Sequence, residues 1–296
     1  MSAREDSLEQ RSREAALTDE VVASFSTARD PRYREVMSSL VRHLHAFVRD
    51  VRLTQDEWDI AISFLTRTGH MSDDLRQEFI LLSDVLGASM MTVAVNSPAR
   101  SGATESTVFG PFFVENAPLI ENGDDIGAGL SGRPCHVSGT VRSVTGEPLP
   151  GARVEIWAAD DEGFYDVQRD GAKLAGRAHL FADENGDFDY WTVQPAAYPI
   201  PHDGPVGTLL DAAGRSPMRP AHIHFMVSQE GYETLITHIF VEGDQWLQND
   251  AVFGVKESLI LPFSEHPPGT GPGGRRISET WSSVRFDIVL ATSTDD

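Results

Sequence analysis

The chain has 296 residues, 40% of them hydrophobic, which is enough for one large domain or two ordinary ones. Its net charge of −21 argues against non-specific nucleic-acid binding, which needs a cationic surface, and disfavours docking on anionic lipid. The single cysteine, Cys135, cannot form an intrachain disulfide or a thiolate cluster and fits a cytoplasmic protein. The polar start lacks the apolar run of a signal peptide, and the apolar stretch 80–95, interrupted by Asp84, is too short for membrane insertion.

The first hundred residues have the pattern of helices. The pair Asp30-Pro31 predicts an N-cap and the first residue of a helix. Residues 54–57, Thr-Gln-Asp-Glu, predict a capping box, and Gly69 is the expected end of the helix that follows it. A third helix is expected from about residue 72 to 95.

The composition changes after these helices. Residues 97–132 are rich in Gly, Ser, Pro and Asn, and they include an extended aromatic segment at 107–114. From residue 134 onward, alternating apolar residues and turn residues predict short strands. The strands are expected near 137–141, 154–158, 221–228, 234–242 and 284–291, with a turn at 183–186 joining two more. We therefore expect an α+β chain, with a helical domain over 1–105 and an all-β sandwich over 106–296.

Two histidines lie one residue apart in the strand expected at 221–228. Residues i and i+2 of a strand point to the same face, so His222 and His224 lie side by side, while Ile223 and Phe225 face the other way. Neighbouring imidazoles pack poorly in a core and are good metal ligands. Alone, the pair leaves open a hydrogen-bonded structural role, a zinc site or a copper site, since no His-Glu-x-x-His pattern settles zinc.

Two of the five tyrosines lie in loop-like segments beside strand ends, where functional residues are often carried. Tyr165 lies in Gly-Phe-Tyr-Asp at 163–166, and Tyr198 lies in a proline-rich segment at 195–201. Either tyrosine alone is more typical of a half-buried ring with a solvated hydroxyl than of a functional residue.

Taken together and in order, segments 163–166, 198–201 and 219–225 resemble the intradiol ring-cleaving dioxygenases, and the likeness covers nearly the whole chain. The aromatic segment 107–113 is similar to the approach to the site in that family. Phenolates are hard, anionic donors that favour Fe(III) over Fe(II). The resemblance implies one mononuclear non-haem Fe(III) per subunit, bound by Tyr165, Tyr198, His222 and His224.

The resemblance also implies roles in the reaction. Tyr198 is expected to leave the metal and take a proton from the substrate, which makes it a ligand and a general base in turn. Arg219 is expected to stabilise the carbanionic form of the substrate, and a surface ion pair is the alternative. His238 is expected to support the ligands without binding the metal, and a hydrogen-bonded core histidine is an equal alternative.

Asp84 suggests which diol is cleaved. By helical spacing it shares one face with Leu81, Ala88 and Met91, and buried acids are rare without a partner. Asp84 is therefore either a charge near a polar edge or the acceptor for an additional substrate hydroxyl. Hydroxyquinol, benzene-1,2,4-triol, has that hydroxyl and catechol does not.

Asp84 and the segment 108–112 resemble the hydroxyquinol-cleaving branch of the family, whose product is 3-hydroxy-cis,cis-muconate or its tautomer maleylacetate in aromatic degradation. The pocket implied by this resemblance has mostly apolar walls and consists of Leu81, Asp84, Val108, Phe109, Gly110, Pro111, Phe112, Ile200, Pro201, Arg219 and Val252.

Two alternatives remain at this point. Within the enzyme class, the substrate is catechol or a chlorocatechol. In another class, the strand-turn-strand pattern at 139–154 resembles prealbumin-like sandwiches, many of which only bind, although that pattern reports fold rather than function. The two tyrosines and two histidines favour the enzyme, because a binding module needs no such set.

The resemblance also implies an assembly. It places the N-terminal helices, residues 1–105, in a linker and dimerisation domain at a homodimer interface, with a phospholipid between the subunits, and the Fe(III) site in the catalytic domain, 106–296. The apolar stripes of the helices fit that interface, and intramolecular packing explains them equally well.

Overall fold

The computed structural model describes residues 3–73, 76–97, 102–168 and 175–293. The chain divides into two compact units, Met1–Arg67 and Thr68–Asp296, and we describe each by itself. The division at residue 105 follows the change in sequence composition, and the roles of dimerisation before it and catalysis after it follow the family resemblance. Both stay predictions.

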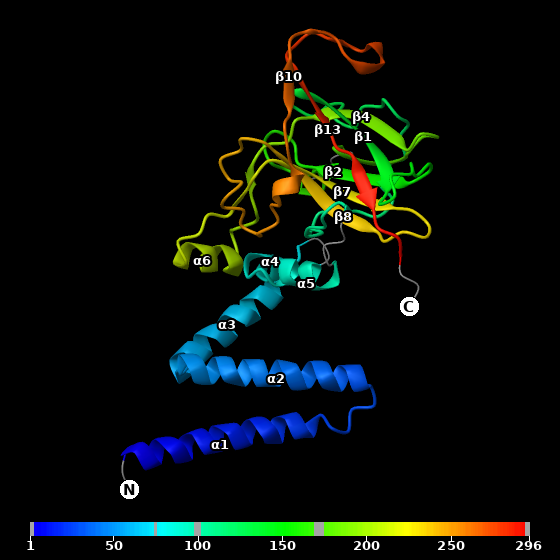
Figure 1. Cartoon of the computed structure of the whole chain (residues 1–296). Helices are drawn as coiled ribbons and strands as arrows, with labels where there is room; N and C mark the ends of the chain where they lie inside the picture. Colours follow the sequence, from blue (N-terminus) through cyan, green and yellow to red (C-terminus); the bar gives the residue numbers. More distant parts are fainter. Residues whose placement is uncertain (1–2, 74–75, 98–101, 169–174, 294–296) are drawn as a thin grey trace. The chain divides into compact units, whose positions relative to one another are not determined.

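The helical unit consists of α1 (Ala3–Ser24), α2 (Pro31–Val51) and most of α3 (Gln55–Met71) (Figure 1). The N-cap prediction is confirmed, because the Asp30 carboxylate accepts a hydrogen bond from the Arg32 amide at 2.8 Å. The capping box is also confirmed, since Thr54 and Glu57 each accept a hydrogen bond from the backbone amide of the other. The expected end at Gly69 is wrong: α3 continues through this glycine to Met71.

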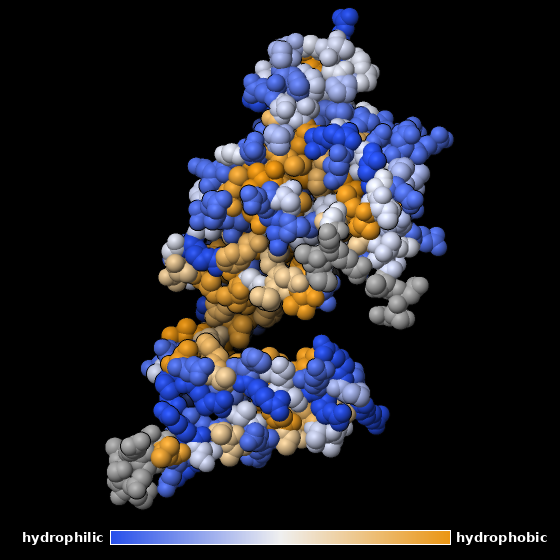
Figure 2. All heavy atoms as spheres, in the orientation of Figure 1, coloured by the Kyte–Doolittle hydropathy of each residue, from blue (hydrophilic) through white to orange (hydrophobic). Residues whose placement is uncertain are grey.

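The helical unit leaves many large apolar side chains at its surface, interspersed with charged ones (Figure 2). Leu44, Phe47 and Trp58 are exposed, whereas Val41 is the buried apolar residue of α2. An open depression of about 900 Å³ lies among such side chains of α1, α2 and α3. This unit therefore buries little apolar surface within itself.

The single helix expected over 72–95 is wrong. The structure has α4 (Glu78–Val85) and α5 (Ala88–Asn96), which are bent by 75° at a break where Gly87 has a φ of +73°. Leu81 and Asp84 are buried on α4, whereas Ala88 and Met91 are exposed on α5, so the four residues do not share one face. No single helix of the described residues is long and apolar enough to span a membrane, and the bent pair α4–α5 passes only by length and composition.

The second unit contains two five-stranded sheets (Figure 1). The first has the order β10-β13-β1-β14, with β4 also paired to β1, and the second has the order β3-β2-β7-β8-β9. The strands of the first sheet are β1 (Pro134–Ser143), β4 (Asp187–Val193), β10 (Ser264–His266), β13 (Trp281–Arg285) and β14 (Ile288–Leu290). Those of the second are β2 (Arg153–Ala158), β3 (Arg177–Phe181), β7 (His222–Ser228), β8 (Leu235–Val241) and β9 (Ile260–Leu261).

Smaller elements complete this unit. Two short pairs join β5 (Tyr198–Pro199) to β6 (Met218–Arg219) and β11 (Gly269–Thr270) to β12 (Arg276–Ile277), and α6 spans Pro205–Ala212. The 3-10 helices are η1 (Asp166–Gln168), η2 (Glu257–Leu259) and η3 (Pro272–Gly274). The sequence did not predict β5, β6 or α6.

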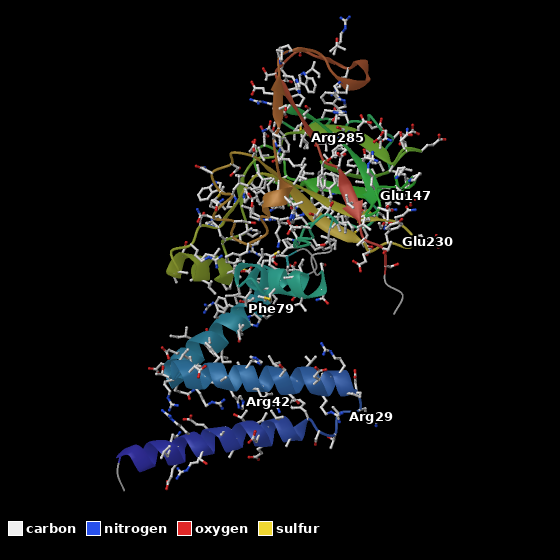
Figure 3. All side chains as sticks on the ribbon, viewed as in Figure 1. Arg29, Arg42, Phe79, Glu147, Glu230 and Arg285 are labelled. Carbon is white, nitrogen blue, oxygen red and sulfur yellow. The ribbon has the colours of Figure 1, made fainter. Side chains whose placement is uncertain are left out.

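One continuous core lies between the two large sheets. It joins Val137 of β1 and Tyr190 of β4 to Ile156 of β2 and to Ile223 and Phe225 of β7. Charged side chains such as Glu147, Glu230 and Arg285 are exposed around it (Figure 3). The expected all-β sandwich, following N-terminal helices, is confirmed.

The strand expected at 284–291 is divided in the structure. β13 and β14 pair in parallel with successive parts of β1, and Phe286 lies between them. The Phe286 backbone approaches β1 so closely that a Cβ on Gly139 would lie 1.9 Å from the Phe286 carbonyl oxygen. Only glycine fits at residue 139, where this division begins.

Candidate metal centre and substrate cavity

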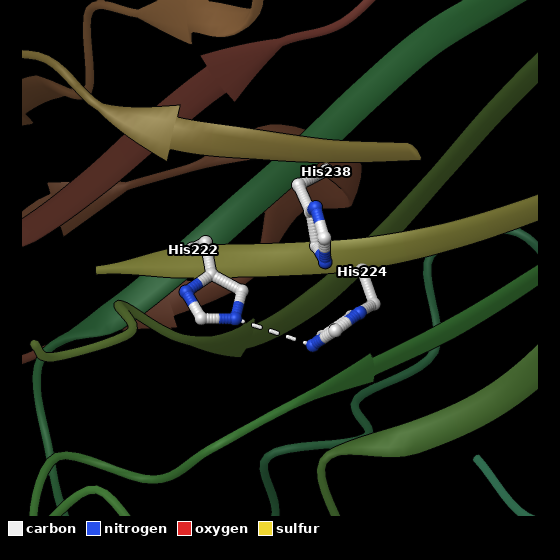
Figure 4. A group of neighbouring side chains, drawn as sticks. All are labelled: His222, His224 and His238. Atoms are coloured by element: carbon white, nitrogen blue, oxygen red, sulfur yellow. Dashed lines mark hydrogen bonds between the residues drawn. The ribbon is translucent and has the colours of Figure 1, made fainter. Parts of the chain in front are cut away.

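Strand β7 places the histidine pair as expected. His222 and His224 are both buried on one face of the strand, while Ile223 and Phe225 enter the sandwich core. Their Nε2 atoms lie 3.2 Å apart (Figure 4). The His222 Nδ1–H donates to the Pro220 carbonyl at 2.7 Å, so its Nε2 lone pair faces the site.

Two loops bring the tyrosines to these histidines. The loop after β2 carries Tyr165, and the Asp160 carboxylate shapes it by accepting the Phe164 amide at 2.9 Å. Pairing of β5 with β6 sets Tyr198 opposite Arg219, three residues before His222. A Cβ on Gly163, whose φ is +84°, would lie 2.4 Å from the Tyr198 Cβ, so the two loops are in direct contact.

The donor atoms of the two tyrosines and two histidines converge. The Tyr165 hydroxyl oxygen lies 3.0 Å from that of Tyr198 and 2.9 Å from the His224 Nε2. The His222 Nε2 lies 3.5 Å from the Tyr165 oxygen and 3.4 Å from the Tyr198 oxygen. Four ligands at about 2 Å from one ion are about 3.3 Å apart, so this spacing suits a mononuclear site.

Burial determines the protonation of these groups. It lowers the pKa of His222 and His224 well below the usual value, which leaves neutral imidazoles able to bind a metal. It also raises the pKa of both tyrosines, although the Arg219 charge partly offsets this for Tyr198. A cation held among the four donors is therefore what would keep the tyrosines as phenolates.

His238 is a neighbour of this set on β8, directly opposite His224 (Figure 4). A nitrogen of His238 lies within 4.8 Å of nitrogens of His222 and His224, so these three could also be considered a metal cluster. However, the His238 Nδ1 is hydrogen-bonded to the Thr107 hydroxyl, and its ring packs against that of His224 at 4.1 Å. The Nε2 of His238 has no hydrogen-bond partner among the described residues. Its expected supporting role stays a prediction.

A narrow cavity lies beside the donor set. Its walls are Leu81, Asp84, Val108, Gly110, Pro111, Phe112, Tyr198, Ile200, Pro201, Arg219 and Val252. Phe109 is the one expected pocket residue that does not line it, because its ring instead packs against Phe113 at 4.8 Å and Trp157 at 5.8 Å. A wider depression adjoins the cavity, because Leu81, Phe112 and Ile200 line both.

Two charged residues stand out in these walls. Asp84 is 3% exposed, and its pKa is raised mainly by burial and also by Asp250, while a hydrogen bond from Ser89 and the Arg219 charge oppose the rise. Arg219 is buried too and pairs with Asp250, so the alternative of a surface ion pair is wrong.

Several residues of the site were not found from the sequence. One of them is Trp157, whose ring stacks on His224 at 4.7 Å, whereas Phe112, which stacks on Tyr165 at 4.5 Å, was already expected in the pocket. Trp157 is the residue of β2 that pairs with His224, so the strand register could have indicated it. Asp250 had no local signal, because it lies far along the chain from Arg219.

Comparisons with known proteins agree with this geometry. A family model described as "Dioxygenase" matches residues 108–292, and one described as "Catechol dioxygenase N terminus" matches residues 30–104. The chain belongs to the intradiol ring-cleaving dioxygenase family. This membership makes it an enzyme and implies a non-haem iron, which the donor set above fits.

Individual intradiol dioxygenases are similar over most of their length. Hydroxyquinol 1,2-dioxygenase of Nocardioides simplex is 58% identical over 96% of this chain and 98% of its own. The crystal structure of hydroxyquinol 1,2-dioxygenase from Pseudomonas putida DLL-E4 matches with a TM-score of 0.88 and 42% identity, over 96% of this chain and 100% of that one. Catechol 1,2-dioxygenase from Pseudomonas arvilla C-1 has a TM-score of 0.83 and 26% identity, over 95% and 92%.

Proposed function

We propose that this protein cleaves hydroxyquinol between its adjacent hydroxyl groups with O2, giving 3-hydroxy-cis,cis-muconate or its tautomer maleylacetate. Both oxygen atoms of O2 enter the product, so no separate reductant is consumed. The observation that carries the proposal is the Asp84 carboxylate, buried in the wall of the cavity that Tyr198 and Arg219 also line. The similar enzymes named above support the same substrate.

Tyr165, Tyr198, His222 and His224 would hold the iron as Fe(III). A ferric ion there would withdraw electron density from a bound catecholate and so would make its ring open to attack by O2. Two phenolates and two neutral imidazoles suit the triple positive charge of a ferric ion. A zinc ion does not require phenolate ligands.

The two tyrosines differ in what they touch. Tyr198 lines the cavity and lies near the Arg219 charge, whereas Tyr165 is stacked under Phe112 and does not line the cavity. Tyr198 is therefore the one placed to accept a substrate proton at its hydroxyl oxygen and to move as the substrate binds. Tyr165 stays fixed.

Arg219 would stabilise the negative charge that develops on the substrate ring. It is fully buried beside the cavity, so its charge acts at low dielectric on a neighbouring anion. The apolar walls around it exclude water from the reacting ring.

Asp84 would bind the third hydroxyl of the substrate, which catechol and chlorocatechols lack. The test measures oxygen uptake with hydroxyquinol, catechol and 4-chlorocatechol, for the wild type and for the similar-sized pair Asp84→Asn and Asp84→Leu. We expect hydroxyquinol to be the best wild-type substrate. Asp84→Leu should lower the hydroxyquinol-to-catechol ratio of kcat/KM by roughly 10- to 100-fold, and Asp84→Asn, which can still hydrogen-bond, should lower it less. An unchanged ratio in Asp84→Leu would make Asp84 a structural residue, and a wild type that prefers catechol or 4-chlorocatechol would remove the hydroxyquinol assignment.

The exposed apolar side chains of the helical unit support a homodimer through the N-terminal helices, with a phospholipid as a further occupant of their depression. A cytoplasmic location rests on the single, buried cysteine. Sedimentation and lipid extraction of the purified protein test the first two, and fractionation of the source cells tests the third.

A further inference from the structure

Asp250 lies in a turn behind the cavity, and its carboxylate pairs with Arg219. The Arg219 Nε donates to Oδ1 at 3.1 Å, and Nη2 lies 3.5 Å from Oδ2. Both side chains are 3% exposed, so the pair is shielded from water. Asp250 thus grips one edge of the guanidinium, the edge formed by Nε and Nη2.

The other edge of the guanidinium faces the reaction site. The Arg219 Nη1 lies 3.1 Å from the His222 Nε2, and the side chain lines the cavity. The guanidinium is planar and rigid, so fixing the Nε–Nη2 edge also fixes the direction of Nη1. Burial alone would lower the pKa of Arg219, and the charge and hydrogen bond of Asp250, together with Tyr198 and Tyr165, more than offset this effect.

The turn that carries Asp250 is fixed by the same carboxylate. It accepts hydrogen bonds from the Gly254 amide at 2.9 Å and from the Val252 amide at 3.3 Å, and Val252 is part of the cavity wall. A Cβ on Gly254 would lie 3.1 Å from the Arg219 Nη2 and 3.2 Å from the Asp250 Oδ2. The close approach of the turn to the ion pair therefore depends on glycine at 254.

Arg215 ties this turn to the helix that carries Asp84. Its guanidinium donates to the carbonyl of Ala251 at 2.9 Å and to that of Val85 at 2.6 Å. It also lies 4.8 Å above the ring of Phe253, whose φ of +60° is unusual for a non-glycine residue. These contacts together hold the backbone of the turn in one conformation, including the unusual φ of Phe253.

We propose that Asp250 is a positioning residue for ring cleavage, which holds Arg219 and the Val252 wall in one arrangement so that the free edge of the guanidinium faces the reacting ring. The proposal rests on the proposed function, since it assumes that Arg219 acts on the substrate. Asp250 itself acts only through Arg219.

The first test is Asp250→Asn in the iron-loaded full-length protein. The amide keeps the size and can still accept from the Gly254 amide, but it loses the charge that holds the guanidinium. We expect kcat with hydroxyquinol to fall at least ~10-fold with KM changed by less than about threefold, because the lost interaction strengthens in the transition state. The visible tyrosinate-to-iron absorption should stay unchanged, since no ligand is altered.

A double-mutant cycle separates positioning from a general structural role. In an Arg219→Gln background, Asp250→Asn should lower kcat by less than about twofold, because the residue that it orients is gone. A loss of the same size with and without Arg219 would overturn the proposal, and so would loss of the visible band in Asp250→Asn.

A second variant keeps the test decisive if Asp250→Asn fails to fold. Gly254→Ala retains both charges and pushes a methyl group against the ion pair, so it should lower kcat with the visible band retained. The matched control is Gly269→Ala, whose added methyl meets only the Pro267 carbonyl at 3.9 Å and should leave kcat unchanged. An unchanged kcat in Gly254→Ala contradicts the proposal. Inactive wild-type protein would instead refute the proposed function, so the two failures are distinct.

Discussion

The helical unit and the sheet unit depart from ordinary packing in opposite ways. In Met1–Arg67, large apolar side chains such as Phe47 and Trp58 are exposed. In Thr68–Asp296, charged side chains such as Asp84, Arg219 and Asp250 are buried. Exposed apolar surface becomes favourable when a partner covers it. A buried charge becomes favourable when it pairs with another charge or with a ligand. The contrast predicts that assembly and chemistry can be altered separately.

The largest effect should come from a metal ligand in the sheet unit. Tyr165→Phe removes one donor and should lower turnover with hydroxyquinol by more than ~100-fold, the upper end for residues that merely support a metal ligand. It should also bleach the wine-red colour of tyrosinate-bound Fe(III), followed in a visible spectrum. Tyr190→Phe is the matched control, because Tyr190 is equally buried and its hydroxyl has no hydrogen-bond partner among the described residues. Colourless wild-type protein with full activity would contradict the ferric site.

An intermediate effect is expected in the helical unit. Phe47→Asp places a charge on its exposed apolar face, where a buried phenyl ring contributes about 1.5–3 kcal/mol. The dissociation constant of the proposed dimer should rise roughly 10- to 100-fold, measured by sedimentation, whereas turnover per iron should not change. Phe47→Leu keeps the face apolar and should assemble normally. A monomeric wild type, or a Phe47→Asp variant that loses activity without dissociating, would contradict the prediction that assembly and chemistry can be altered separately.

The smallest effect concerns Cys135 in the sheet unit. Burial raises the pKa of this thiol to about 12, so at pH 8 almost none of it is the reactive thiolate, and the fraction grows only as the pH approaches 12. A thiol reagent should therefore react slowly with the native protein at pH 8 and fully after unfolding in guanidinium. Rapid reaction of the native protein would show that the sandwich core opens more readily than its packing indicates.

Local patterns in the sequence predicted the parts of the site that depend on local structure. Strand alternation placed His222 and His224 on one face, and the capping residues at 30 and 54 marked two helix starts correctly. The tyrosines were identified only through the family resemblance, because the sequence of a loop does not predict where a tyrosine side chain points. The structure brings Tyr198 to the histidines through the β5–β6 pairing, which is too short to be recognised in the sequence, and it brings Tyr165 there through the loop after β2.

The remaining features depend on contacts between distant segments. Periodicity continued one helix through residues 85–88, but Gly87 turns the chain into the left-handed region and starts a second helix. Phe109 faces Trp157 rather than the cavity, since its direction depends on a neighbour far along the sequence. Asp250 was missed for the same reason, because its partner Arg219 and its turn meet only in the folded chain.

The contact between Gly163 and Tyr198 has a consequence for protein engineering. The loop before Tyr165 and the segment that carries Tyr198 have no room between them for even a methyl group. A library that varies one segment alone would therefore disturb both tyrosines of the proposed iron site at once. To exchange specificity between related enzymes, residues 160–166 and 195–201 should be transferred together, with position 163 left as glycine. Substitutions that vary specificity should be made in the cavity walls outside these two segments.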